Sequence, residues 1–71
     1  MMTPFKLKAG SEYIELNKLL KIMGWAGSGG EANQLIESGF VQVNGSEETQ
    51  KRKKLVAGDQ VTYEAYKVVI E

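Results

Sequence analysis

The sequence contains no cysteine and no histidine, and only one proline among its 71 residues. Without cysteine, neither disulfides nor thiolate–metal bonds can stabilise the fold. Without cysteine and histidine, the chain also lacks the most common general base, the thiol nucleophile and the imidazole ligand of metals. Its nine carboxylates follow no repeated metal-binding spacing. We therefore expect no enzymatic activity, no bound metal and no cofactor.

Long apolar runs are also missing. No run approaches the roughly 20 residues that cross a bilayer, and the start, Met-Met-Thr-Pro-Phe-Lys-Leu-Lys, has no apolar segment like that of a secretion signal. We expect a cytoplasmic protein with no membrane contact. A hydrophobic fraction of 42% and a charged fraction of 25% are typical of a globular domain. At this length the chain forms one domain, residues 1–71, with a small stability margin.

An excess of either charge is absent as well, because nine basic residues balance nine acidic ones. A net charge of zero counts against nucleic-acid binding, since dedicated binders are often strongly basic. Four of the nine cations are nevertheless consecutive: Lys51, Arg52, Lys53 and Lys54. Segregated charges can produce a local positive field on a neutral protein, so the total charge does not decide the matter.

Apolar spacing predicts a short strand and then a first helix. Phe5 and Leu7 alternate with lysines, which favours a half-buried strand. From about residue 15 the period becomes helical, with one apolar stripe formed by Leu16, Leu19, Leu20 and Met23. Gly24 is placed to end this helix in the left-handed conformation, with Trp25 packing back onto Leu20.

A second helix is indicated by its start and its end. Ser28 and Glu31 form the pattern of a capping box, in which each residue bonds the backbone of the other. Ala32, Leu35 and Ile36 are expected on the inner face. Gly39 repeats the ending of the first helix, with Phe40 over Leu35.

Beyond Phe40 the apolar period becomes two, which predicts strands. Val41 and Val43 lead into Asn44-Gly45, a strong hairpin signal, and residues 46–49 are expected to return as a strand. A turn at 57–59 precedes strands around 61–63 and 68–70. The predicted fold class is α+β, with two packed helices on one side of a small antiparallel sheet.

The basic run is the best candidate contact surface. Its alternative role is a solvated edge strand whose charges prevent aggregation. In a regular strand only about half of its side chains would face one ligand, whereas a loop would let more converge. Lys18 and Lys21 on the first helix are more often solvating residues than contacts.

The glycine-rich segment 27–32 has the letters G-x-G-x-x-A of a dinucleotide fingerprint, but a helix rather than a strand precedes it. Its amides at a helix start could receive a phosphate, or the segment could be only a tight turn. Ser28 shares this ambiguity. Among the aromatic residues that could stack on bases, Trp25 and Tyr63 have structural explanations, whereas Tyr13 and Tyr66 stay open.

Three stretches together resemble the S4 (S-four) RNA-binding domain, which is named after a small-subunit ribosomal protein. They are Glu-Leu-Asn-Lys-Leu-Leu at 15–20, Ser-Gly-Gly-Glu-Ala-Asn-Gln-Leu-Ile-Glu-Ser-Gly-Phe-Val-Gln-Val-Asn-Gly at 28–45 and Val-Ala-Gly-Asp-Gln-Val at 56–61. The whole chain resembles the standalone bacterial members of this family. The resemblance implies an αL motif, a helix pair with a β-loop, that docks on structured RNA through phosphates.

The family's RNA-binding surface corresponds here to Lys18, Lys21, Ser28, Lys51, Arg52, Lys53 and Lys54. The chain departs from the family where many members have Arg or Lys, because it carries Glu15 at the first helix and Gly29, Asn33 and Gln34 in the second. Binding is therefore expected to rely on the basic run. Asn44 and Gly45 match the hairpin turn of the family.

Three functions remain. The first is non-catalytic binding of structured RNA, such as rRNA or tRNA, by a monomer. The alternative is a protein-interaction adaptor of the same fold, with association to the ribosome as an open option. The third, which has the least support, is a sensor of a small anionic molecule at the glycine-rich segment.

Overall fold

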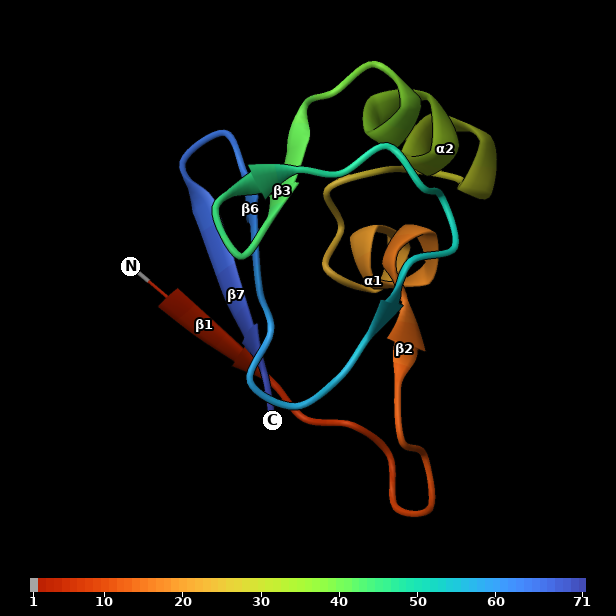
Figure 1. Ribbon diagram of the computed structural model, residues 1–71. Coiled ribbons are helices and arrows are strands. Elements are labelled where there is room, and N and C mark those ends of the chain that lie inside the picture. The colour runs from red at the N-terminus through yellow and green to blue at the C-terminus, as the bar shows by residue number, and fades with distance from the viewer. Residues whose placement is uncertain (1) are drawn as a thin grey trace.

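A computed structural model describes residues 2–71 of the chain; Met1, which belongs to the expected domain, lies outside the described residues. The two helices are α1 (Leu16–Ile22) and α2 (Gly29–Glu37). The strands are β1 (Met2–Phe5), β2 (Ile14–Glu15), β3 (Val41–Val43), β4 (Ser46–Glu47), β5 (Lys54–Leu55), β6 (Gln60–Tyr63) and β7 (Tyr66–Ile70). Both helices lie on the same side of the larger sheet (Figure 1). The predicted α+β architecture is confirmed.

The strands form two sheets rather than one. The larger sheet has the order β1-β7-β6-β3-β4, and β2 pairs separately with β5. The prediction of an antiparallel sheet is wrong at one edge, because β1 pairs with β7 in parallel, from Met2↔Lys67 to Phe5↔Ile70. A parallel pair needs a long crossover connection, and here almost the whole chain lies between the two strands.

The first strand also begins earlier than expected. It ends at Phe5 rather than spanning Phe5 to Leu7, although the pairing continues past it through a bond from the Leu7 amide to the Glu71 carbonyl of 3.0 Å. Phe5 and Leu7 are partly buried against the core, as their alternation predicted.

The end of α1 follows the prediction in its backbone. Gly24 has a φ of 77°. The Trp25 amide donates to the Leu20 carbonyl at 3.0 Å and the Gly24 amide to the Lys21 carbonyl at 3.1 Å, which is the Schellman pattern. The indole ring of Trp25 packs against the core beyond the end of the helix. There it contacts Tyr63 and Tyr66, and the sequence did not predict these contacts.

The start of α2 shows a variant of the predicted capping box. Ser28 Oγ accepts from the Glu31 amide at 3.2 Å, as expected, but Glu31 Oε2 accepts from the amide of Gly27 at 2.8 Å instead of that of Ser28. At the other end, Gly39 has a φ of 83°, and the Phe40 amide donates to the Leu35 carbonyl at 3.1 Å. Most of the Phe40 side chain is exposed.

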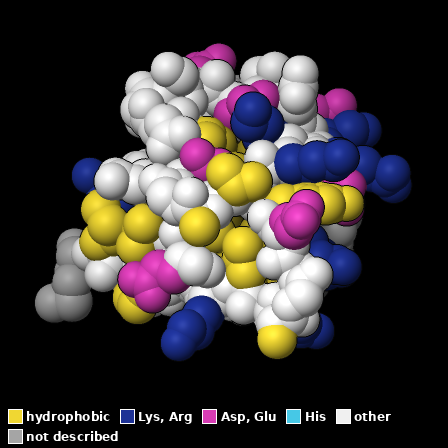
Figure 2. Space-filling view, turned by 60° about the horizontal axis from the view of Figure 1, so that its bottom comes forward, with side chains coloured by type: hydrophobic (Ala, Val, Ile, Leu, Met, Phe, Trp, Pro, Cys, Tyr) yellow, Lys and Arg dark blue, Asp and Glu magenta, His cyan; other side chains and the backbone are white. Residues whose placement is uncertain are grey.

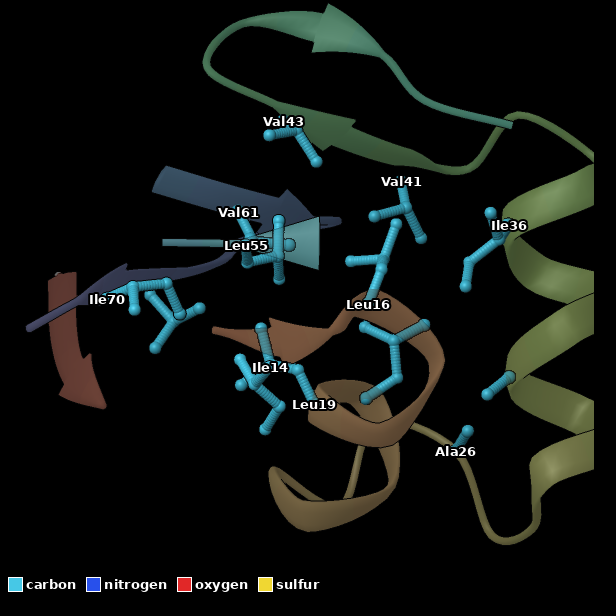
Figure 3. Packing of buried hydrophobic residues seen from close by; sticks show 13 residues of the cluster. Ile14, Leu16, Leu19, Ala26, Ile36, Val41, Val43, Leu55, Val61 and Ile70 are labelled. Atoms are coloured by element: carbon cyan, nitrogen blue, oxygen red, sulfur yellow. The ribbon is translucent and has the colours of Figure 1, made fainter. Parts of the chain in front are cut away.

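The core lies between the helices and the sheet (Figure 3). Both helices and the strands contribute fully or almost fully buried residues, among them Leu16, Leu19, Leu20, Ala32, Ile36, Val41, Leu55, Val61, Val68 and Ile70. Burying these side chains is the main driving force for folding. Leu55 and Ile14 pair across the β2–β5 ribbon and belong to this cluster. The core therefore anchors β5, the strand in which the basic run ends.

The predicted hairpin is confirmed at Asn44 and Gly45, whose φ angles are 53° and 84°. The positive values are those of the turn type that Asn-Gly favours. The returning strand is shorter than expected, because β4 covers only Ser46–Glu47 rather than residues 46–49. Within residues 2–71, no helix has the length and apolar character needed to traverse a bilayer.

Candidate nucleic-acid interface

Lys51, Arg52 and Lys53 form the second half of the loop between β4 and β5, and Lys54 begins β5. The backbone of this basic run hydrogen-bonds the start of α1. The Lys53 carbonyl accepts from the Leu16 amide at 2.9 Å, and the Lys51 carbonyl accepts from the Asn17 amide at 3.0 Å. These amides belong to the first helical turn, where no carbonyl of the helix itself is available. Only Lys54 lies in a strand, so the alternation of a regular strand does not separate the other three cations.

The four side chains of the run differ in their surroundings. Lys51 Nζ lies 3.7 Å from Glu37 Oε2, and both side chains are about half exposed. Lys54 Nζ lies 4.9 Å from the ring centroid of Tyr13. Arg52 is exposed and Lys53 partly buried. An exposed ion pair contributes only about 0–1 kcal/mol, so Glu37 competes weakly with a phosphate for Lys51.

Two lysines of α1 continue the positive charge along the helix. Lys18 directly follows Asn17, whose amide bonds the basic run, and Lys21 lies one turn further on. Lys21 Cδ lies 3.9 Å from the position that a Cβ would occupy at Gly29, so this side chain runs along the start of α2. We define the basic surface as Lys18, Lys21, Lys51, Arg52, Lys53 and Lys54. On the face drawn in Figure 2, Lys and Arg side chains gather along the right-hand edge.

The helices are joined beneath this surface by a polar bond that sequence reasoning missed. Asn17 Nδ2 donates to Asn33 Oδ1 at 3.1 Å. Asn33 stands where the resemblance led us to expect a cation. Its observed contact holds α2 against α1. The two asparagines are 16 residues apart, and no pattern within either helix predicts that they pair.

Ser28 lies next to Gly29, at the edge of the basic surface beside Lys21. Its Oγ is occupied by the Glu31 amide, and the Gly27 amide is occupied by the Glu31 carboxylate. The chain thus supplies its own anion to the glycine-rich segment. This arrangement favours the tight turn over the anion site, and a contact from Ser28 to a ligand stays a prediction.

A separate aromatic cluster lies beyond the C-terminal end of α1. The Trp25 ring centroid is 6.0 Å from that of Tyr63 and 5.9 Å from that of Tyr66. A hydrogen bond with Glu64, aided by desolvation and the charge of its carboxylate, raises the pKa of Tyr63 above its ordinary value. The cluster accounts for Trp25 and Tyr63 as structural residues, whereas Tyr66 remains 56% exposed.

Comparison with known proteins gives a consistent result. A family model described as an S4 domain matches residues 5–71. YbcJ of Escherichia coli strain K12 and YbcJ of Shigella flexneri are each 43% identical to this chain over 58 residues, which is 82% of this chain and 83% of theirs. The solution structure of E. coli YbcJ, described as revealing an αL motif involved in RNA binding, superposes with a TM-score of 0.72 at 40% identity, covering 99% of this chain and 87% of that one.

Proposed function

The chain belongs to the S4 domain family, and we propose on this basis that it binds structured RNA through phosphate contacts and shape, without catalysing a reaction. The RNA-binding αL motif described for YbcJ supports the proposal, because the two chains share fold and sequence over most of their length. The basic surface is the proposed contact region, with Ser28 at its edge.

One observation carries this assignment. The carbonyls of Lys51 and Lys53 accept hydrogen bonds from the first-turn amides of α1, so the backbone of the basic run is fixed against the helix that bears Lys18 and Lys21. Because the backbone of the basic run is already fixed, binding a polyanion has to order only its side chains. Each phosphate that they neutralise releases counterions, and this release supplies most of the affinity for nucleic acids.

The expected target is a helical RNA with its loops and junctions, as in rRNA or tRNA. The deep, narrow major groove of A-form RNA admits no helix, so a rigid helix pair recognises backbone geometry rather than sequence. The proposal includes a cytoplasmic, monomeric protein, and binding to ribosomal RNA would associate it with the ribosome.

The test compares two double variants that lose the same charge. Lys51→Ala/Arg52→Ala removes two cations of the basic surface, whereas Lys6→Ala/Lys67→Ala removes two exposed cations elsewhere. In filter-binding or fluorescence-anisotropy titrations with an RNA hairpin, we expect the first variant to lose at least about tenfold in affinity. The second should stay within about threefold of the unmodified protein.

Circular dichroism and thermal unfolding serve as the control that both variants are folded. Equal losses in the two variants would mean that only total charge matters, and the basic surface would not be the site. The adaptor function predicts a different result: no RNA binding even at low salt, and protein partners in a pull-down that survive nuclease treatment.

A further inference from the structure

A groove lies beside the basic surface, between the segment that follows β1 and the outer face of α1. Phe5, Leu7, Tyr13, Ile14, Lys18 and Ile22 line it, and we call it the Tyr13 groove. Its apolar part is formed by Phe5, Leu7, Ile14 and Ile22. The Ile22 side chain is 56% exposed on a helix that otherwise buries its apolar residues. The groove thus keeps an apolar surface accessible to a flat ligand.

Tyr13 forms the aromatic side of this groove. It is 43% exposed, although the neighbouring Ile14 is almost fully buried. Tyr13 directly precedes β2, and its exposure shows that the core does not require its side chain. An exposed tyrosine ring provides a surface on which any nucleobase can stack.

The charges around the groove suit a ligand that carries both an anionic group and hydrogen-bond donors. Lys8 and Lys18 line it, and Lys54 Nζ lies 4.9 Å from the Tyr13 ring centroid. Lys18 and Lys54 also belong to the basic surface, so the two sites are continuous. Glu12 and Glu15 line the groove as well, and their carboxylates can accept only from a donor such as the exocyclic amine of a base.

We infer that the Tyr13 groove takes an unpaired nucleotide of the bound RNA. The base stacks on Tyr13 against the apolar lining, and Lys8 and Lys18 contact its phosphates. This inference rests on the proposed function and refines it. The preferred RNA is a helix with a flipped-out or bulged residue beside the phosphates that the basic surface contacts.

The experiment uses two RNA hairpins that differ only in one unpaired adenosine within the stem. The unmodified protein should bind the bulged hairpin at least about fivefold more tightly, the lower range for stacking one base on an aromatic side chain. Tyr13→Ala should remove this preference while still binding the continuous hairpin, and Tyr13→Phe should retain it. Tyr66→Ala is the matched control, because Tyr66 is also an exposed tyrosine but packs on Trp25 beyond the other end of α1.

The outcomes separate this inference from the function on which it rests. If neither hairpin binds at low salt, the proposed function fails. If both bind equally, or if Tyr13→Ala keeps the preference, the function stands and the groove is not the nucleotide site. Thermal unfolding checks that each variant is folded.

A second readout does not depend on the hairpins. Adenosine monophosphate added to the unmodified protein should shift the NMR signals of the Ile22 methyl groups and the Tyr13 ring. Shifts centred instead on the Trp25 indole would place the stacking site in the aromatic cluster and overturn the assignment.

Discussion

At the scale of single residues, Asn44 connects two turns that lie 15 positions apart in the sequence. Its Nδ2 donates to Asp59 Oδ1 at 3.0 Å, and its Oδ1 accepts from the Gln60 amide at 2.9 Å. Asp59 Oδ2 in turn accepts from the Val56 amide at 2.9 Å. The sequence predicted a hairpin at Asn44, but not that the same side chain fixes the turn before β6.

Replacing Asn44 by Ala should lower the free energy of unfolding by about 2 kcal/mol. The change removes two side-chain hydrogen bonds. It also places alanine, whose side chain cannot form the local hydrogen bonds of asparagine, at a positive φ. Asn44→Gly should cost less, because glycine tolerates this conformation. Urea unfolding measures the loss, and Thr49→Ala, at an exposed position outside the strands, is the control. A loss no larger than that of Thr49→Ala would contradict the role of the side chain.

At the scale of elements, both helices end on a glycine with positive φ, Gly24 and Gly39. The two sites differ in their surroundings. A Cβ at Gly24 would have no neighbour within 4 Å, whereas at Gly39 it would lie 2.8 Å from Glu47 Oε1. Glu47 is an exposed, flexible side chain and can rotate away. The backbone conformation therefore dominates the cost at both sites.

Alanine substitutions at Gly39 and at Gly30 should change the free energy of unfolding in opposite directions, because only Gly39 has a positive φ. Gly39→Ala should lower the free energy of unfolding by about 1 kcal/mol. Gly30→Ala, inside the first turn of α2, should raise it by a few tenths to about 1 kcal/mol, since its Cβ would make only an ordinary contact, at 3.9 Å, with Ser28 Oγ. Thermal unfolding followed by circular dichroism checks both. Destabilisation by Gly30→Ala would mean that the start of α2 needs the freedom of glycine there.

The helices and strands also differ in how well the sequence predicted them. Helix periods, Schellman endings, the Ser28 cap and the Asn-Gly hairpin were predicted because each is encoded within about ten consecutive residues. The parallel pairing of β1 and the bonds from the basic run to α1 were missed, because their partners are far apart in sequence. For the site, sequence indicated which cations matter, whereas the Tyr13–Lys54 contact required the folded chain.

At the scale of the whole molecule, formal neutrality hides an uneven distribution of charge. Six of the nine cations belong to the basic surface, which is organised around α1. Such a segregated charge acts only over about a Debye length, roughly 8 Å at physiological salt. Binding should therefore depend on close contact with phosphates rather than on long-range attraction.

The salt dependence of RNA binding measures the number of these contacts. If about four cations neutralise phosphates, a plot of log affinity against log salt should have a slope of about −3 to −4. Replacing Lys51, Arg52, Lys53 and Lys54 together by Ala should remove most of the binding and flatten the slope, while the circular dichroism spectrum is retained. Binding that does not vary with salt would exclude a phosphate-based mechanism.

The parallel pairing of β1 with β7 has a consequence for the order in which the protein folds. While the chain is being synthesised, β1 has no partner until residues 66–70 have left the ribosomal tunnel, because those residues form its hydrogen-bonded neighbour. The helix pair and the Asn44 hairpin can form earlier from short-range contacts. We expect the growing chain to acquire its central part first and to pair its first strand with its last strand at the end, as a late and cooperative closing step.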